Sequence, residues 1–191
     1  MSDLAARLEA ILRASPTWAV LESARELDLP DWLLFSGAVY QPVWNHLTGR
    51  PPGHGTKDFD LAYFDGSDLS WEAEDGVIRR AAAALPPALA AMTEVRNQAR
   101  VHLWFEVHFG EPYEPLTCTA QALTRFVAPA FAVGARLEAD GRLTVVAPFG
   151  LEDVFAMRIR PNPLRASTSR DRIVAGLRTR WPEITVANSP A

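Results

Sequence analysis

Two carboxylates stand at the start of a segment that is otherwise apolar. The segment reads KDFDLAYFD over residues 57–65, and a single phenylalanine separates Asp58 from Asp60. Successive side chains of a strand point to opposite faces, so we expect both aspartates on one face, roughly 6–7 Å apart at the backbone. Two carboxylates at this spacing can bind one hard cation, Mg²⁺ or Mn²⁺, which completes its shell with water and phosphate oxygens. The alternative is a solvated strand end, although like charges on one strand face repel without a counter-ion.

A glycine turn precedes this pair. The stretch LLFSGAVYQPVWNHL, residues 33–47, predicts a short strand, a turn at Gly37 and a helix over Ala38–Leu47. A turn that opens a helix directs backbone N–H groups at an anion. We therefore expect the N–H groups of Gly37 and Ala38 to bind the phosphates of a nucleoside triphosphate whose metals lie on the aspartates.

A third carboxylate would complete a two-metal site, and Glu106 is the candidate. In VHLWFEVHF, residues 101–109, apolar and polar side chains alternate, which predicts a strand whose polar face carries His102, Trp104, Glu106 and His108. If that strand neighbours the aspartate strand, Glu106 approaches the aspartates and Trp104 is placed to stack a base. An exposed strand glutamate with no role fits the same spacing.

The surrounding pattern predicts helices and strands in mixed order. We expect an α+β class with a mixed central sheet flanked by helices, and a single domain over residues 1–191. The Asp140-Gly141 pair predicts a hairpin turn. The expected elements are N-terminal helices within residues 1–29, strands over 31–37 and 58–64, a helix from residue 70 with Ser70 as N-cap, one or two strands within 93–110, a hairpin over 131–148 and a C-terminal helix over 169–181.

Composition limits the classes of partner and compartment. The formal net charge is −4, so a generic nucleic-acid-binding surface is not expected. The one cysteine, Cys118, cannot form an internal disulfide, and the N-terminal pattern differs from a signal peptide. No apolar run is long enough to span a membrane. These features predict a cytoplasmic location.

The combined blocks resemble a known group of proteins. SGAVYQPVWNHLTG, KDFDLAYFD, VRNQARVHLWFEVHFG and APFGLEDVFAMRIRPNP occur in this order. They resemble a small bacterial nucleotidyltransferase family of the DNA polymerase beta-like superfamily, over roughly residues 29–181. The resemblance implies a nucleotidyltransferase fold, with Gly37 as the turn glycine and Asp58 and Asp60 as metal ligands. The usual Gly-Ser of the turn is Gly37-Ala38 here, so the phosphate-binding hydroxyl is expected from Ser36.

The expected activity is metal-dependent transfer of a nucleoside monophosphate from a nucleoside triphosphate to an acceptor that the sequence does not identify. Lys57, the only lysine of the chain, precedes Asp58 and is suited to neutralise a phosphate. Arg100 is a second candidate phosphate ligand, and His102 a candidate contact for the base or ribose. Two other readings remain open: a nucleotide-binding module of the same fold that transfers nothing, and an antitoxin-like regulatory partner of another protein.

Overall fold

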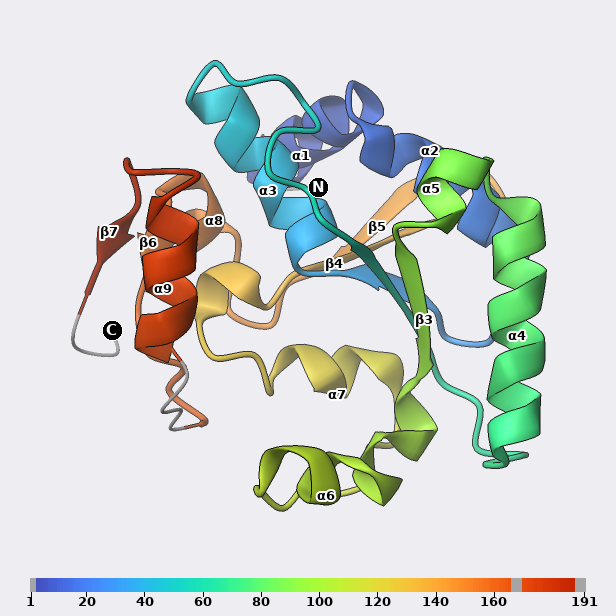
Figure 1. Ribbon diagram of the computed structural model, residues 1–191. Helices are drawn as coiled ribbons and strands as arrows, with labels where there is room; N and C mark the ends of the chain where they lie inside the picture. Colours follow the sequence, from blue (N-terminus) through green and yellow to red (C-terminus); the bar gives the residue numbers. More distant parts are fainter. Residues whose placement is uncertain (1–2, 166–169, 188–191) are drawn as a thin grey trace.

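The structure is a computed structural model and describes residues 3–165 and 170–187. Its centre is a five-stranded sheet in the order β3-β2-β1-β4-β5. β2 and β3 are parallel, whereas β1 pairs antiparallel with β2 and with β4, and β4 pairs antiparallel with β5. The mixed sheet and the helices around it confirm the predicted α+β class (Figure 1). The strands are β1 (Leu33–Phe35), β2 (Phe59–Tyr63), β3 (Thr93–Asn97), β4 (Gly134–Leu137) and β5 (Leu143–Val146).

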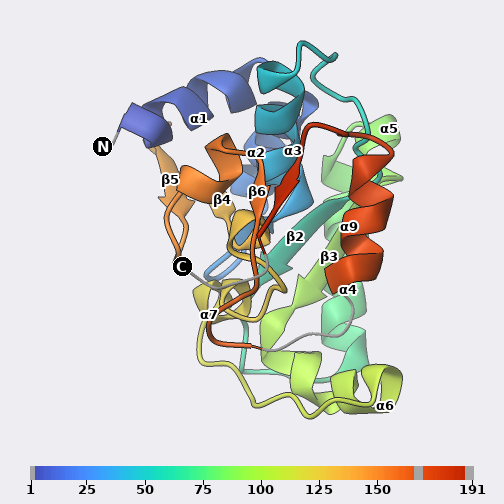
Figure 2. The ribbon, with the colours of Figure 1, turned by 90° about the vertical axis from the view of Figure 1, so that its left-hand side faces the viewer.

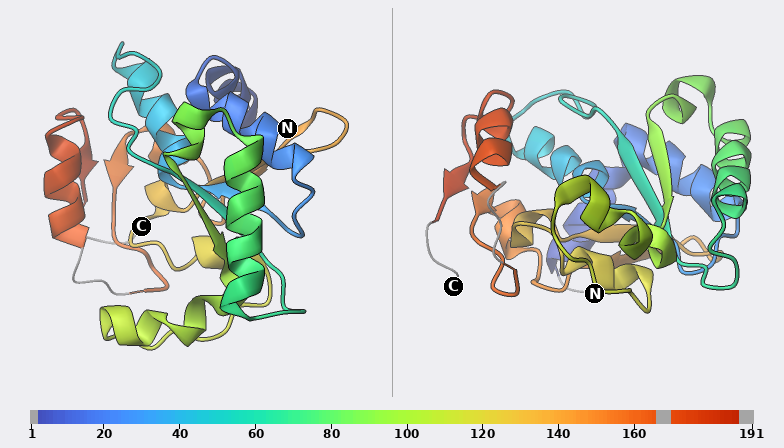
Figure 3. Two further views of the ribbon diagram at one scale, coloured as in Figure 1. Left: turned by 45° about the vertical axis from the view of Figure 1, so that its right-hand side comes forward. Right: turned by 60° about the horizontal axis from the view of Figure 1, so that its bottom comes forward.

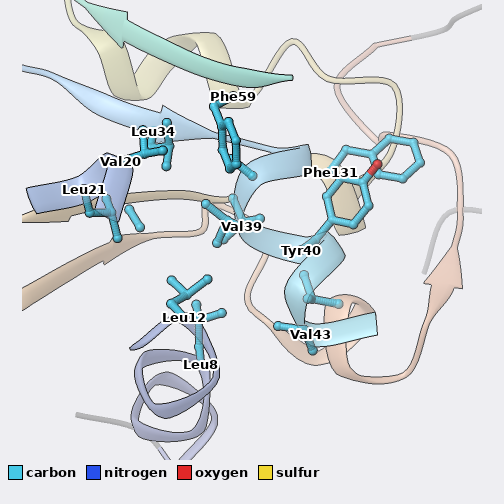
Figure 4. Packing of buried hydrophobic residues seen from close by; sticks show 14 of the residues in the cluster. Leu8, Leu12, Val20, Leu21, Leu34, Val39, Tyr40, Val43, Phe59 and Phe131 are labelled. Carbon is cyan, nitrogen blue, oxygen red and sulfur yellow. The ribbon is translucent and has the colours of Figure 1, made fainter. Parts of the chain in front are cut away.

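The N-terminal helices cover one face of this sheet. Figure 4 shows leucines of α1 and α2 packed toward Leu34 of β1, Val39 of α3 and Phe59 of β2. These side chains belong to the main hydrophobic core, which fixes the ends of β1 and β2 relative to the start of α3. The helices up to β3 are α1 (Asp3–Arg13), α2 (Pro16–Glu26), α3 (Gly37–Leu47), α4 (Trp71–Ala84) and the short α5 (Pro87–Ala90).

Strand alternation divides the side chains of the sheet between its two faces. In β2, Leu61 joins the main core, whereas Ala62 joins a second, smaller cluster together with Leu33 and Phe35 of β1. That second cluster is closed by α7 (Thr119–Leu123), which lies on the opposite side of the sheet from α1–α3 (Figure 1). Because α7 covers only part of this face, polar residues of β2 and β3 remain accessible beside it.

The predicted strand over Val101–Phe109 is wrong. β3 ends at Asn97, whose side-chain oxygen accepts the Ala99 N–H at 3.1 Å and the Asp65 N–H at 3.0 Å. The chain then forms a 3-10 helix, η1 (Gln98–Leu103), and α6 (Phe105–Phe109). Phe105 and Phe109 contact each other with 4.7 Å between their ring centroids, a helical i, i+4 contact. Positions four apart also satisfy an alternation of period two, which explains the incorrect assignment.

The C-terminal part of the chain is hydrogen-bonded to α3 and to the loop that precedes Asp58. Trp181 is completely buried, and its indole N–H donates to Asn45 Oδ1 at 2.9 Å. Arg180 donates to the Gly55 carbonyl at 2.6 Å. Figure 1 and Figure 2 show α9 next to the small parallel pair of β6 and β7. The elements that follow β2, β3 and α7 in this part of the chain, apart from β4 and β5, are η2 (Pro129–Phe131), α8 (Glu152–Phe155), β6 (Arg158–Ile159), α9 (Arg170–Arg178) and β7 (Thr185–Val186).

None of the helices within the described ranges combines the length and apolar character needed to cross a membrane.

Candidate active site

Asp60 and Glu94 lie side by side on adjacent strands. They are register partners in the parallel pairing of β2 with β3, and both point away from the core that buries Leu61 and Val95. Asp58 lies two residues before Asp60, directly ahead of β2, and is exposed. The fold therefore gathers three carboxylates at one edge of the sheet face that α7 leaves open.

The proximity of these groups changes the acidity of Asp60. The pKa of Asp60 rises from 3.8 to about 6, first because the surrounding protein desolvates the carboxylate, and then because Asp58 and Glu94 repel its charge. The Arg96 guanidinium opposes the rise. Arg96 follows Glu94 on the same strand face and forms a loose ion pair with it, 3.7 Å between Nη2 and Oε2. Negative charge is thus concentrated at Asp60 beyond what the neighbouring arginine neutralises.

The start of α3 lies next to these carboxylates because Phe35 is the register partner of Asp60. Ser36 occupies the N-cap position with φ +49°, and its side chain makes no capping hydrogen bond. The first N–H groups of an α-helix lack intrahelical partners, so this helix start is suited to bind an anion. Thr17 Oγ1 donates to the Ala38 carbonyl at 2.7 Å and fixes the first turn.

Gly37 leaves little room beside the helix start. A Cβ at this position would lie 2.8 Å from Nε2 of Gln41, one turn along the helix. Gln41 is buried, and its Oε1 has no hydrogen-bond partner among the described residues. A buried amide oxygen without a donor beside an uncapped helix start is a polar feature that an additional hydrogen-bond donor, from a ligand or water, would explain.

Tyr40 and Arg180 bring further polar groups to this end of the site. Burial raises the pKa of Tyr40 to about 12, the Gln41 side chain and Arg180 oppose the rise, and Asp58 and Asp60 add to it. Arg180 donates a hydrogen bond to the Gly55 carbonyl. In the described part of the chain, no carboxylate lies within ion-pair distance of its guanidinium. A guanidinium without a carboxylate partner, near the uncapped helix start, is suited to an anionic ligand.

A cavity of about 510 Å³ lies beside Ser36, Asp60 and Glu94. This volume lies within the range of small-molecule binding sites. Its polar lining includes Ser36, Asp60, Glu94 and Arg96, and its far end is lined by aromatic side chains. In the right-hand view of Figure 3, α6 and α7 come forward on this side of the sheet.

The comparisons with known proteins agree with this geometry. A family model described as "Nucleotidyltransferase" matches residues 22–186, which include the helix start and all three carboxylates. The chain belongs to this nucleotidyltransferase family. It is also similar to a protein whose NMR structure "reveals a CCA-adding enzyme head domain", with a TM-score of 0.73 and 26% sequence identity, over 95% of this chain and 94% of that chain. Among curated proteins, none matches.

In this nucleotidyltransferase, Ser36 and Asp60 line the cavity, with Gly37 and Ala38 directly after Ser36 and Asp58 two residues before Asp60. Lys57 is exposed beside Asp58, where a solvated side chain can reach a phosphate. The predicted third carboxylate, Glu106, is not brought to them. It is exposed on α6, away from any strand, and does not line the cavity.

Arg100 and His102 also lie outside the cavity lining. The Arg100 guanidinium donates through Nη1 to Glu74 Oε2 and through Nε to the Leu69 carbonyl, so two of its five N–H donors are used within the protein. His102 lies in η1 and its Nδ1 is buried without a partner in the described structure. The structure therefore gives Arg100 a structural role beside α4.

Sequence reasoning missed Glu94, Arg96 and Arg180. The alternation in TEVRN, residues 93–97, predicts a strand with Glu94 and Arg96 on one face, and this signal was available. The pairing register that sets Glu94 beside Asp60 has no local signal. The same is true of Arg180, which lies in the turn after α9 and donates to the Gly55 carbonyl in the loop before Asp58.

The donor set of the nucleotidyltransferase fits a divalent cation. Within residues 3–165 and 170–187, no three His, Cys, Asp or Glu side chains already converge as a closed metal cluster. The carboxylates of Asp58, Asp60 and Glu94 are nevertheless close enough for their charges to raise the pKa of Asp60. Carboxylate oxygens are the ligands that Mg²⁺ and Mn²⁺ use, and Mg²⁺ is usually bound by only one or two of them plus phosphates.

Proposed function

We propose that this nucleotidyltransferase transfers a nucleoside monophosphate from a nucleoside triphosphate to a hydroxyl of an acceptor, and that it uses Mg²⁺ or Mn²⁺. Asp58, Asp60 and Glu94 are the proposed metal ligands, with Glu94 in the place first assigned to Glu106. A bound divalent cation supplies neutralisation of phosphate charge and makes the acceptor hydroxyl more acidic. The cytoplasmic location expected from the sequence is part of the same proposal.

Different groups of the protein are proposed to bind different parts of the triphosphate along the cavity. The N–H groups of Gly37 and Ala38, with the Ser36 hydroxyl, are proposed to bind the β- and γ-phosphates. Lys57 and Arg180 add positive charge at this end. The α-phosphate then lies near Asp60 and Glu94, where the acceptor oxygen forms a bond to phosphorus.

The bond that breaks lies between the α-phosphorus and the oxygen that bridges to the β-phosphate, and pyrophosphate leaves with that oxygen. Glu94 is the proposed proton acceptor for the attacking hydroxyl, because it lies on the edge strand β3, across Asp60 from the helix start. Holding phosphates and nucleophile in line is the main task of such a site.

One observation carries this proposal: the register that sets Phe35, Asp60 and Glu94 in a row across three strands. It places an uncapped helix start and two carboxylates on one wall of a single cavity. An anion-binding helix start next to a cation-binding pair is the combination that a metal-bound triphosphate requires.

The test measures ATP binding by calorimetry with and without Mn²⁺, and identifies the products by chromatography. We expect Mn²⁺-dependent binding and slow formation of AMP and pyrophosphate with water as acceptor. Asp60→Asn should weaken Mn²⁺-dependent binding by at least tenfold, whereas Asp75→Asn, on the surface of α4, should leave it unchanged.

Two results would contradict the proposal. ADP and inorganic phosphate as products would show attack at a different phosphorus. Tight Mn²⁺-ATP binding without any release of pyrophosphate, with water or with a panel of hydroxyl acceptors, would identify a nucleotide-binding module that transfers nothing.

A further inference from the structure

We propose that the far end of the cavity is a stacking site for the nucleobase of the donor triphosphate. This inference rests on the proposed function and adds the part of the substrate that the carboxylates and the helix start do not contact. The site consists of four aromatic side chains of the segment from Trp104 to Tyr113, which we call the aromatic wall. Its members are Trp104, Phe105, Phe109 and Tyr113, and all four line the cavity.

The rings of the aromatic wall form one continuous group. The centroid of Phe105 lies 4.5 Å from that of Tyr113 and 4.7 Å from that of Phe109. Trp104 adds its indole at 6.1 Å from Phe105 and 6.3 Å from Phe109. A flat heterocycle can stack on such a surface whatever its hydrogen-bonding pattern, because every base has a π-face.

Burial in the core does not account for two of these rings, those of Trp104 and Phe109. Phe109 is 59% exposed and Trp104 is 37% exposed, although both are large and apolar. Both belong to neither of the two hydrophobic clusters of the described chain. Side chains of this kind that open onto a cavity are typical of ligand contact.

Arginines border the aromatic wall. The guanidinium carbon of Arg125 lies 5.4 Å from the ring centroid of Tyr113, and that of Arg165 lies 5.9 Å from Phe105. Arg165 is also fixed by Glu111 at 2.5 Å and by the Arg125 carbonyl at 2.6 Å. Planar guanidinium groups at the edge of an aromatic surface add to the stacking of a base.

The path from the carboxylates to the aromatic wall suits a nucleoside. β2 and β3 run in parallel from Asp60 and Glu94 to Ala62 and Arg96, about 7 Å further along the strands, and η1 and α6 follow β3. The phosphates are assigned to the opposite end of the cavity, at the start of α3. With its α-phosphate at the carboxylates, the ribose and base of the donor extend along the strands to the aromatic wall.

The experiment compares two probes in the presence of Mn²⁺: ATP, and inorganic triphosphate, which has no base. Phe109→Ala and Trp104→Ala should each weaken ATP binding by about tenfold and leave the binding of inorganic triphosphate unchanged. Phe109→Leu keeps apolar volume without a ring, and should also weaken ATP binding. Val107→Ala is the matched control, because Val107 lies on the same helix but is 91% exposed and does not line the cavity.

Thermal unfolding of each variant checks that it folds. If the parent protein binds both probes and the aromatic variants bind ATP as the parent does, the base site is overturned. The same conclusion follows if both probes weaken equally, because the lost contact is then not with the base. If the parent binds neither probe with Mn²⁺, the proposed function itself fails, and this outcome is distinct from the other two.

Discussion

Asp60 and Glu94 face the same side of the sheet as direct partners in the β2–β3 pairing. Backbone hydrogen bonds between two strands, rather than side-chain packing, therefore set the separation of the two carboxylates. A site built in this way tolerates the loss of a charged side chain without losing its geometry. Conservative substitutions at either position are therefore expected to keep the fold, so that their effect on metal binding can be measured.

Glu94→Gln should lower Mn²⁺ affinity by about tenfold, because it removes one charged ligand and keeps the shape of the side chain. Titration of the protein with Mn²⁺, followed by electron paramagnetic resonance of the free ion, measures the change. Glu106→Gln is the control and should bind Mn²⁺ as the parent does, since Glu106 lies outside the cavity. A larger loss in Glu106→Gln than in Glu94→Gln would restore the original assignment.

Asp60→Asn should stabilise the metal-free protein above pH 6. The folded protein raises the pKa of Asp60 from 3.8 to about 6, so it binds this proton more tightly than the unfolded chain does. The stability that protonation contributes is complete below about pH 4 and is lost as the pH rises to about 6.

Asp60→Asn has no carboxyl group to ionise at this position, so its stability does not fall for this reason over this pH range. We expect the Tm of Asp60→Asn to exceed that of the parent by about 2–4 °C at pH 7 and to match it near pH 4. The difference at pH 7 corresponds to ~1 kcal/mol in a chain of this size, after allowance for solvent screening of the Asp60 charge. Scanning calorimetry without metal, at both pH values, tests this. A difference in Tm that is equal at both pH values would show that charge at Asp60 is not the cause.

Mn²⁺ affinity should depend on pH in the same window. Below a pKa of about 6 the cation competes with the proton on Asp60, so affinity should rise about tenfold per pH unit and level off above pH 6. Calorimetry in two buffers of different ionisation enthalpy measures the proton released on binding. The charge of Asp58 contributes to the raised pKa of Asp60, so Asp58→Asn should move the levelling point to lower pH. A flat profile between pH 4.5 and pH 7 contradicts this prediction.

Gly37→Ala should weaken the binding of inorganic triphosphate by about tenfold with little loss of stability. Alanine favours the helix over glycine by about 1 kcal/mol, but the new Cβ would lie 2.8 Å from Gln41 Nε2 and beside the phosphates. The double variant Gly37→Ala/Gln41→Ala removes the clash with the amide. Binding should remain weak in the double variant if Gly37 is needed for close approach of phosphate. Full recovery would mean that Gly37 acts only through Gln41.

Asp153 anchors the segment that follows α8. Its buried carboxylate accepts from Arg158 Nε and Arg160 Nε, each at 2.6 Å. Asp153→Ala leaves two guanidinium groups without their partner and should lower the free energy of unfolding by about 3–5 kcal/mol, measured by urea unfolding. Asp75→Ala removes the surface ion pair with Arg79 on α4 and should cost less than about 1 kcal/mol. Equal losses in the two variants would contradict the anchoring role.

Local patterns predicted much of this fold. The apolar spacing of α1 and α2, the N-cap at Ser70 and the hairpin turn at Asp140-Gly141 are each specified by residues close in sequence, and the structure confirms all of them. Ser70 Oγ accepts the Ala73 N–H at 3.2 Å, as a capping serine does. The positions of Gly37, Asp58 and Asp60 at the end of β1 and the start of β2 follow from the same kind of signal.

The remaining parts depend on contacts that no short window contains. Glu94 becomes relevant only through the register of β2 with β3, and Arg180 only through the docking of the C-terminal segment. The segment from Val101 to Phe109 satisfies two periodicities at once. Its helical form follows Asn97, which caps η1 and accepts the N–H groups of Ala99 and Asp65 where β3 ends.

The bonds of Arg180 and Trp181 also set the order in which the site is completed during synthesis. Arg180 and its acceptor Gly55 are 125 residues apart, and Trp181 and Asn45 are 136 residues apart. At ~5–20 residues per second, the ribosome adds Arg180 roughly 6–25 s after Gly55. For most of this interval the nascent chain already contains the residues of β1, α3 and β2, but the loop before Asp58 has not received its anchor. This loop is made early and is therefore among the last parts of the site to be fixed.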